Sequence, residues 1–260
     1  MIQNTRKHSK ISLLSDRVHL ITHFQQLNEG RSIASFLLGD FFSPKRHDEN
    51  ILKLRDIQAK DVEAAVQRVD MIRKSMSEAA LIPSRFDLLE KGISSVTLEG
   101  CFAEFGVYKG DTLNFIAQKT NKIVHGFDSF LGLPQDWRPG LPKGTFKVDR
   151  YRYLDFRNNV RIWKGMFEDT IPRFNDETGN QPIAFLHVDC DLYTSTKTIF
   201  EKLGHRIHKG TVIVFDEFFG YPGWSNGEYK AFKEFVDSSV SKFKYLACNH
   251  LGEQTAIVVL

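Results

Sequence analysis

The pattern of apolar and polar positions divides the chain into two regions, which meet near Leu81. Residues 57–76 place apolar side chains at mixed spacings of three and four, and this spacing predicts an amphipathic helix. Residues 15–42 have the same character and are expected to form one or two more helices, broken at glycines. The sequence therefore predicts a helical N-terminal extension over residues 1–80.

Beyond Leu81, short apolar runs alternate with amphipathic segments, which is the pattern of parallel strands covered by helices on both faces. The candidate strands are residues 101–105, 122–127, 160–164, 183–188 and 211–215. The candidate helices are residues 111–119, 167–175, 194–206 and 228–240. Two final apolar runs, 243–250 and 255–260, are separated by a short polar link and predict an antiparallel hairpin. The predicted fold class of residues 81–260 is therefore α/β, a Rossmann-like, seven-stranded, mostly parallel sheet with a C-terminal antiparallel hairpin.

Composition and charge narrow the class of protein. A chain of 260 residues, 42% of them hydrophobic, fits one sizeable core with an appended piece. A net charge of +3 is typical of an ordinary protein surface, so no nucleic-acid partner is expected. No segment reaches the ~20 apolar residues of a membrane span, so we expect no membrane association and a cytoplasmic location. The cysteines have no CxxC spacing and are expected to be reduced thiols.

Ligands of such sheets bind beyond the carboxyl ends of the strands, so the residues that end each strand are the candidates for function. The first strand runs into the turn EFGVYKGDT, in which Gly106 and Gly110 allow a tight turn and a close approach of the backbone to a ligand. The turn departs from the dinucleotide pattern GxGxxG, and Glu104 would repel a phosphate and attract a cation. The turn thus favours a cofactor with an ammonium group, and a purely structural β–α turn is the alternative.

The next two strand ends favour an adenosine-like ligand. Asp128 ends the second strand, where an acid accepts hydrogen bonds from both hydroxyls of a ribose; a turn aspartate is the alternative. Met166 and Phe167 follow the third strand, where they would flank an adenine ring, unless they pack in the core. The long link over residues 129–159 is rich in glycine, proline and aromatic residues and is expected to be a substrate lid or a surface insertion.

Carboxylates follow the fourth and fifth strands. Asp189 ends the fourth strand, and Asp216 and Glu217 end the fifth. Neighbouring parallel strands end about 5 Å apart, so the three acids converge, and a hard divalent cation would relieve their repulsion. These residues predict a Mg²⁺ or Mn²⁺ site, with a helix cap or a solvated strand end as the alternative for each acid alone. Asp191 is expected instead to cap the following helix.

Five motifs, taken in order and with their separations, resemble one family. They are EFGVYKG, FDSFLGLP, GMFEDTIP, DCDLYTST and VIVFDEF, within about residues 95–240. The combination is similar to the macrocin O-methyltransferase (TylF-like) group of class I S-adenosylmethionine-dependent methyltransferases. The residues that the resemblance implies for S-adenosylmethionine are Glu104, Gly106, Tyr108, Gly110, Asp128, Ser129 and Phe167. The implied ligands of Mg²⁺ (or Mn²⁺) are Asp189, Asp216 and Glu217. Two departures stand out, because Glu217 replaces a usual aspartate and Cys190 replaces a usual glycine.

The activity implied is transfer of a methyl group from S-adenosylmethionine to a hydroxyl of a small molecule, with Asp189 as metal ligand and general base. Chelation by two vicinal oxygens would favour a sugar or another vicinal diol from natural-product or glycan biosynthesis. N-terminal helices of related enzymes cover the substrate and form dimers, so a homodimer is expected. Two other functions stay open. One is a metal-dependent glycosyltransferase that uses the DxD motif, and the other is a non-catalytic scaffold that keeps the fold.

Overall fold

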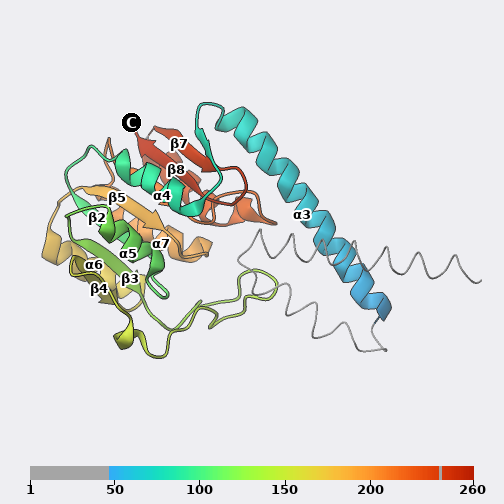
Figure 1. The fold of residues 1–260 in the computed structure, drawn as a ribbon, viewed down its shortest axis with the longest axis horizontal. Coiled ribbons are helices and arrows are strands. Elements are labelled where there is room, and N and C mark those ends of the chain that lie inside the picture. The colour runs from blue at the N-terminus through green and yellow to red at the C-terminus, as the bar shows by residue number, and fades with distance from the viewer. Residues whose placement is uncertain (1–46, 240–241) are drawn as a thin grey trace, which may run out of the picture. The chain divides into compact units, whose positions relative to one another are not determined.

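The computed structural model describes residues 47–239 and 242–260 (Figure 1). The chain divides into two compact units, of which the larger comprises residues 57–137 and 142–260. The smaller unit comprises residues 1–56 and 138–141, and its described parts are the start of helix α3 (His47–Ser75) and one short turn. The helix predicted over residues 57–76 is confirmed as part of α3. The helices predicted over residues 15–42 lie outside the described residues.

An eight-stranded sheet forms the centre of the larger unit. Its strands are β1 (Ala80–Ile82), β2 (Cys101–Phe105), β3 (Val124–Asp128), β4 (Val160–Lys164), β5 (Ile183–Val188), β6 (Val212–Phe215), β7 (Phe243–Asn249) and β8 (Thr255–Val259). Their order is β1-β7-β8-β6-β5-β2-β3-β4, and among the described strands only β8 runs against its neighbours. The predicted mostly parallel sheet and its antiparallel β7–β8 hairpin are therefore confirmed.

The predicted number of seven strands is wrong, because β1 adds an eighth. This strand has only three residues and pairs in parallel with β7 at the edge of the sheet. Three residues are too few to show an alternating pattern, and Pro83 follows them directly. The strand exists because β7 offers it an open edge, which the local sequence does not reveal.

Helices cover both faces of the sheet (Figure 1). Besides α3, the described helices are α4 (Arg85–Ser94), α5 (Asp111–Gln118), α6 (Phe167–Thr178), α7 (Tyr193–Leu203) and α8 (Glu228–Ser239). Short 3-10 turns are η1 (Tyr151–Tyr153), η2 (Gly204–Arg206) and η3 (Trp224–Asn226). The four helices predicted between the strands are confirmed as α5 to α8, and the end of the third forms η2.

Helix α4 was not predicted, although its sequence carries the signals of a helix start. Ser84 is the N-cap, and its hydroxyl oxygen accepts a hydrogen bond from the N–H of Asp87 (3.3 Å). Leu88, Leu89 and Ile93 follow at helical spacing and are buried. The consequence for function is that α4 brings its first residue to the ends of β5 and β6.

Side chains alternate between two apolar layers, one under α4 and α5 and the other under α6, α7 and α8. In β2, Phe102 packs in the first layer, whereas Ala103 and Phe105 pack in the second. The acids that follow β5 and β6 come directly after these buried strands. The strand order reverses between β2 and β5, so their carboxyl ends flank the crevice where ligands of such sheets bind.

Helix α3 keeps part of its apolar stripe exposed. Val62, Val66 and Val69 are 64%, 60% and 54% exposed, whereas Met76, just beyond the helix, is buried in the core. The predicted amphipathic face is thus only partly covered within the described residues. None of the helices in that part of the chain has the length and apolar character that a membrane span requires.

His125 is a buried histidine whose protonation opposes folding. Its Nδ1 accepts a hydrogen bond from the indole N–H of Trp163 (3.1 Å). Burial, followed by the charges of Arg161 and Arg206, lowers its pKa from 6.5 to about 4. Between these two pH values the unfolded chain binds a proton that the folded chain does not, so stability falls as the pH is lowered through that window.

We therefore expect His125→Asn to remove part of the acid sensitivity of the fold. Relative to wild type, the loss of unfolding free energy between pH 7 and pH 4.5 should shrink by up to about 2 kcal/mol. Urea unfolding at the two pH values measures this difference. His205→Asn, at an exposed position, is the matched control and should keep the wild-type slope. An unchanged slope in His125→Asn would contradict the prediction.

Candidate active site at the carboxyl ends of the strands

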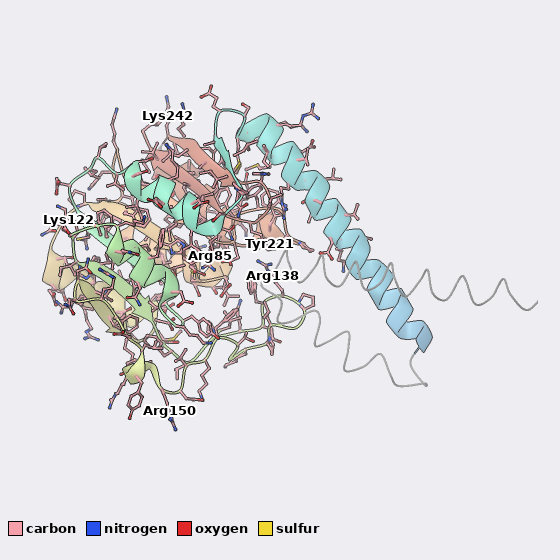
Figure 2. The ribbon with its side chains drawn as sticks, in the orientation of Figure 1. Arg85, Lys122, Arg138, Arg150, Tyr221 and Lys242 are labelled. Atoms are coloured by element: carbon pink, nitrogen blue, oxygen red, sulfur yellow. The ribbon has the colours of Figure 1, made fainter. Side chains whose placement is uncertain are left out.

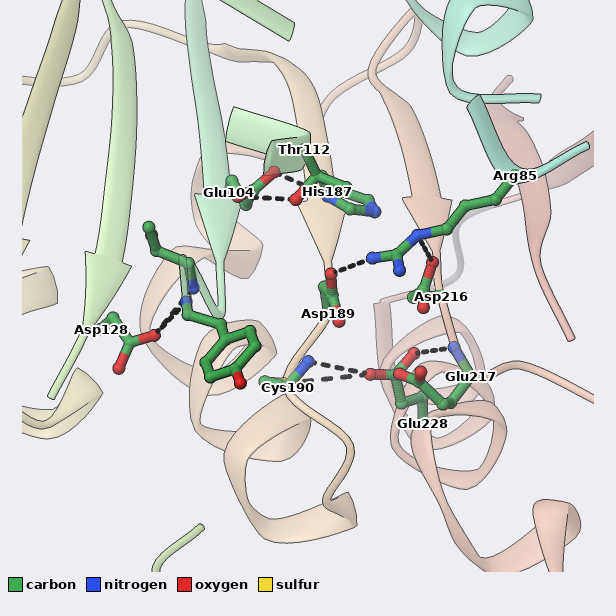
Figure 3. A network of polar contacts seen from close by, with 12 residues as sticks. Arg85, Glu104, Thr112, Asp128, His187, Asp189, Cys190, Asp216, Glu217 and Glu228 are labelled. Carbon is green, nitrogen blue, oxygen red and sulfur yellow. Dashed lines mark hydrogen bonds and ion pairs between the residues drawn. The ribbon is translucent and has the colours of Figure 1, made fainter. Parts of the chain in front are cut away.

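The carboxyl ends of β2, β5 and β6, together with the start of α4, bring charged side chains into one buried cluster (Figure 3). Basic residues such as Lys122, Arg150 and Lys242 are exposed at the periphery, whereas Arg85 is directed inward toward this cluster (Figure 2). The cluster is largely acidic. Its electrostatic balance therefore depends on very few positive groups.

Arg85 lies between two of the predicted metal ligands. Its guanidinium donates a hydrogen bond to Oδ2 of Asp189 (2.6 Å), and its Nε lies 2.8 Å from Oδ1 of Asp216. The second contact is an ion pair without hydrogen-bond alignment, which leaves Oδ1 of Asp216 buried without a hydrogen bond. A positive charge at a helix N-terminus is unfavourable in itself, so the two carboxylates account for the orientation of Arg85.

The charges of this group shift one another strongly. Burial alone would lower the pKa of Arg85, but Asp216 and Asp189 raise it above its ordinary value, so the guanidinium is charged at every accessible pH. Burial and then repulsion from Asp216 raise the pKa of Asp189 to about 7, even though Arg85 acts in the other direction. Asp189 is thus a carboxylate held close to the point of protonation at neutral pH.

Glu104 and His187 form a second pair beside Arg85. The Glu104 carboxylate lies 2.9 Å from Nδ1 of His187 and accepts a hydrogen bond from the Thr112 hydroxyl (3.2 Å). Both side chains are buried; burial raises the pKa of Glu104, and the Glu104 carboxylate raises that of His187 despite burial. The carboxylate of Glu104 thus contacts His187 and Thr112 inside the protein, and its predicted role toward an ammonium group stays a prediction.

His187 was not among the residues predicted for the site. In the described chain, His187, Asp189 and Asp216 form a group whose potential ligand atoms all lie within 4.8 Å of one another. The signal was present in the sequence, because His187 lies two residues before Asp189 and therefore on the same face of β5. Its register partner on β2 is Glu104.

Glu217 is not part of this group of three residues. Asp216 points toward Arg85, whereas the N–H of Glu217 donates to Oε2 of Glu228 (3.3 Å) at the start of α8. The other oxygen of Glu228 accepts the N–H of Cys190 (3.4 Å), and Oε2 of Glu217 is buried with no hydrogen-bond partner in the described chain. Burial raises the pKa of both glutamates well above the ordinary value. The buried Glu228 was not predicted.

The interpretation of Asp191 as the cap of the following helix is wrong. Helix α7 begins at Tyr193, and its N-cap is Leu192 and not Asp191. Asp191 lies one residue earlier, with a left-handed backbone (φ 65°), and is buried. Its charge is among the causes that raise the pKa of Glu217 and Glu228. Asp191 therefore belongs with these two glutamates.

The glycine turn after β2 is required by the protein itself. Gly106 has φ +95°, and a Cβ there would lie 1.6 Å from the carbonyl oxygen of Asp189. Gly110 is the N-cap of α5 with φ +87°, where a Cβ would lie 2.6 Å from the ring of Phe156. The fold itself thus requires glycine at both positions. The sequence alone could not distinguish this requirement from a role in contacting a ligand.

Asp128 holds the same turn. Its Oδ2 accepts hydrogen bonds from the N–H groups of Val107 and Tyr108 (2.8 Å each), and its Oδ1 accepts from Phe130 (2.6 Å). A carboxylate has about four acceptor positions, so these bonds leave room for one more donor. The turn-aspartate alternative therefore describes contacts that are present, and a ribose contact would be additional.

The other predicted cofactor residues occupy varied positions. The ring of Tyr108 stands edge-on to Phe146 (5.4 Å between centroids), and its backbone is left-handed (φ 50°). The hydroxyl of Ser129 accepts the N–H of Leu131 (3.1 Å). Phe167 begins α6 and packs edge-on against Phe105 (5.0 Å), which is the core packing that the sequence left open.

The donor chemistry of the acidic cluster fits a hard divalent cation. Asp189 and Asp216 offer carboxylate oxygens, and Oδ1 of Asp216 has no hydrogen bond in the described chain. Glu217 also has a carboxylate oxygen, Oε2, without a hydrogen bond there. The position between Asp189 and Asp216 is held by the guanidinium of Arg85. The residues thus suit a metal ion in chemistry, with one of the protein's own cations already in place.

Comparison with known proteins identifies the domain around this cluster. Residues 103–218, which run from β2 to just beyond β6, match the family described as "Methyltransferase domain". The chain is thus similar to a methyltransferase domain over these residues. The matched segment contains the switch point between β2 and β5 and the ends of both strands.

One curated relative of the methyltransferase domain comes from Streptomyces olivaceus. It is the 8-demethyl-8-(2,3-dimethoxy-alpha-L-rhamnosyl)-tetracenomycin-C 4'-O-methyltransferase, 28% identical over 162 residues. The match covers 52% of this chain and 60% of the relative. The chain is thus aligned to less than two thirds of the relative's length.

Two solved structures share the fold of the methyltransferase domain. The calicheamicin methyltransferase CalS11 has a TM-score of 0.56 and 22% identity, over 76% of this chain and 91% of its own. The O-methyltransferase NovP has a TM-score of 0.50 and 20% identity, over 67% of this chain and 78% of its own. The predicted Rossmann-like fold is confirmed by these similarities.

Proposed function

We propose that the protein transfers a methyl group from S-adenosylmethionine to a hydroxyl oxygen of a small molecule. The observation that carries the proposal is the match of residues 103–218 to a methyltransferase domain, because that match includes every strand end of the candidate site. It favours methyl transfer over the glycosyltransferase that the DxD motif alone left open. It also fits the switch-point position of the acidic cluster.

The methyl donor would lie across the ends of β2, β3 and β4. The Gly106–Gly110 turn and Asp128 would border its ribose, and Tyr108, Ser129 and Phe167 lie on the segments that follow β2, β3 and β4. Glu104 would act from inside the protein by orienting His187, since its carboxylate bonds that ring. An ammonium group at this place would meet Asp189 before it met the buried Glu104.

A divalent metal, Mg²⁺ or Mn²⁺, would be held by Asp189 and Asp216; the third predicted ligand, Glu217, lies outside the group that these two acids form with His187. When bound, such an ion supplies a Lewis acid that lowers the pKa of an alcohol and fixes its orientation. Asp189 then has the role of general base, because its carboxylate lies at the switch point and its pKa is close to neutral. The buried walls of α4 and β5 would exclude water from the reacting atoms.

We infer that the acceptor is a sugar hydroxyl. The name of the Streptomyces relative places its methyl group on the 4'-hydroxyl of a rhamnosyl group of tetracenomycin C. A vicinal diol would fit this proposal, because it would present two cis oxygens to Asp189 and Asp216. The proposal also includes a homodimer. The exposed valine side chains of α3 are the surface at which its interface would be sought.

Ligand binding tests the proposed function without knowledge of the acceptor. We expect calorimetry to detect S-adenosylhomocysteine binding and no binding of UDP, with or without Mg²⁺. S-Adenosylhomocysteine is chosen because it lacks the reactive methyl group but keeps every other contact. Binding of UDP alone would favour the glycosyltransferase, and binding of neither compound would favour a non-catalytic scaffold.

A further inference from the structure

We propose that Arg85 is the resident cation of the predicted metal site, and that its guanidinium and a divalent cation exclude each other between Asp189 and Asp216. The basis is the bridging contact of Arg85, 2.6 Å to one acid and 2.8 Å to the other. The inference deepens the proposed function and depends on it only for the expectation that a metal binds at these acids.

The geometry leaves one position for a positive charge. Asp189 and Asp216 each lie an even number of residues after a side chain that packs in the apolar layer under α4 and α5. Both carboxylates are directed toward the start of α4, where they contact Arg85. An ion that joins their oxygens would occupy the place where the guanidinium now lies. Because arginine keeps its charge at every accessible pH, the guanidinium stays a competitor of the metal ion.

Arg85 is held in a way that lets it leave. Its side chain is 29% exposed, and its contact with Asp216 is an ion pair without hydrogen-bond alignment. The helix start also disfavours its positive charge. The backbone of α4 is fixed separately by the Ser84 cap and by the buried Leu88 and Leu89, so the side chain can swing out while the helix stays in place.

The arrangement has a consequence for the protein without metal. Two carboxylates this close together, one buried and one partly buried, would repel each other, and Arg85 neutralises that repulsion. The fold therefore does not need a divalent ion in order to form. The same neutralisation weakens metal binding, because the ion must displace a positive group that already satisfies the acids.

Titration of the folded protein with Mn²⁺ tests the proposal. We expect calorimetry to give at least tenfold tighter Mn²⁺ binding by Arg85→Gln than by wild type, which equals about 1.4 kcal/mol. Lys91→Gln is the matched control, because it removes one positive charge from the exposed last turn of the same helix. This control should bind Mn²⁺ as weakly as wild type. Adding Asp216→Asn to Arg85→Gln should abolish the gain.

A second variant guards against loss of the fold. Arg85→Lys keeps a charge but reaches both acids less well, so its Mn²⁺ affinity should lie between wild type and Arg85→Gln. Circular dichroism checks that each variant is folded, and Mn²⁺ should raise the Tm of both variants more than that of wild type. Equal or weaker Mn²⁺ binding by both folded variants would overturn the proposal.

The same proteins separate this proposal from the proposed function. S-Adenosylhomocysteine affinity is measured independently of Mn²⁺. If no variant binds S-adenosylhomocysteine but Arg85→Gln gains Mn²⁺ affinity, the competition holds and the methyltransferase function fails. If all bind S-adenosylhomocysteine and no gain in Mn²⁺ affinity appears, the function stands and the role of Arg85 is overturned.

Discussion

Replacement of Asp189 by asparagine is expected to lower methyl transfer by at least about a thousandfold while the protein stays folded. Asp189 ends β5 at the switch point and is the acid whose pKa lies near 7. Asparagine has nearly the same shape but can neither accept the proton of an alcohol nor offer a negative charge to a metal. The single change would remove both roles proposed for this carboxylate.

Initial rates with S-adenosylmethionine, Mg²⁺ and a rhamnoside that the wild type methylates measure this effect. S-Adenosylhomocysteine affinity, measured by calorimetry, should change far less than the rate. Asp191→Asn is the matched control, because Asp191 lies two residues further along the chain but is not in the group formed by His187, Asp189 and Asp216. Asparagine tolerates the left-handed backbone at this position, so the rate should stay close to wild type. Equal losses in the two variants would contradict the assignment of Asp189.

Gly106→Ala is expected to cost more than about 4 kcal/mol of unfolding free energy. The added Cβ would lie 1.6 Å from the carbonyl oxygen of Asp189, and both partners of this clash are backbone atoms of the turns that end β2 and β5. Neither can move without opening the pair of strands that defines the switch point. The positive φ of +95° adds strain of its own.

Gly223→Ala is the control that separates the clash from the strain. Gly223 has a similar φ of +83°, but a Cβ there would have no atom within 4 Å. Its cost should therefore be about 1 kcal/mol, the usual penalty of a left-handed residue. Urea unfolding of the three proteins measures both values. Similar stabilities of the two variants would show that β2 and β5 do not approach each other as closely as described.

The elements around the candidate site were largely predictable from the sequence. Residues 101–105 and 183–188 coincide with β2 and β5, because strands buried on both faces read as continuous apolar runs. Residues 160–164 coincide with β4, an edge strand that is only partly buried. The switch point follows from the order of such elements. By contrast, β1 depends on an open edge supplied by β7, which lies far away in the chain.

The site itself was predictable only as a set of strand ends. The sequence by itself determined that Glu104, Asp128, Asp189 and Asp216 end parallel strands, since local apolar runs define where strands stop. Only the tertiary structure decided which of these charges meet. The side chain of Asp216 meets Arg85, whereas the backbone N–H of Glu217 meets Glu228, and α4 delivers a cation from about a hundred residues away. Such pairings depend on register and on the packing of distant segments, and a linear pattern contains neither.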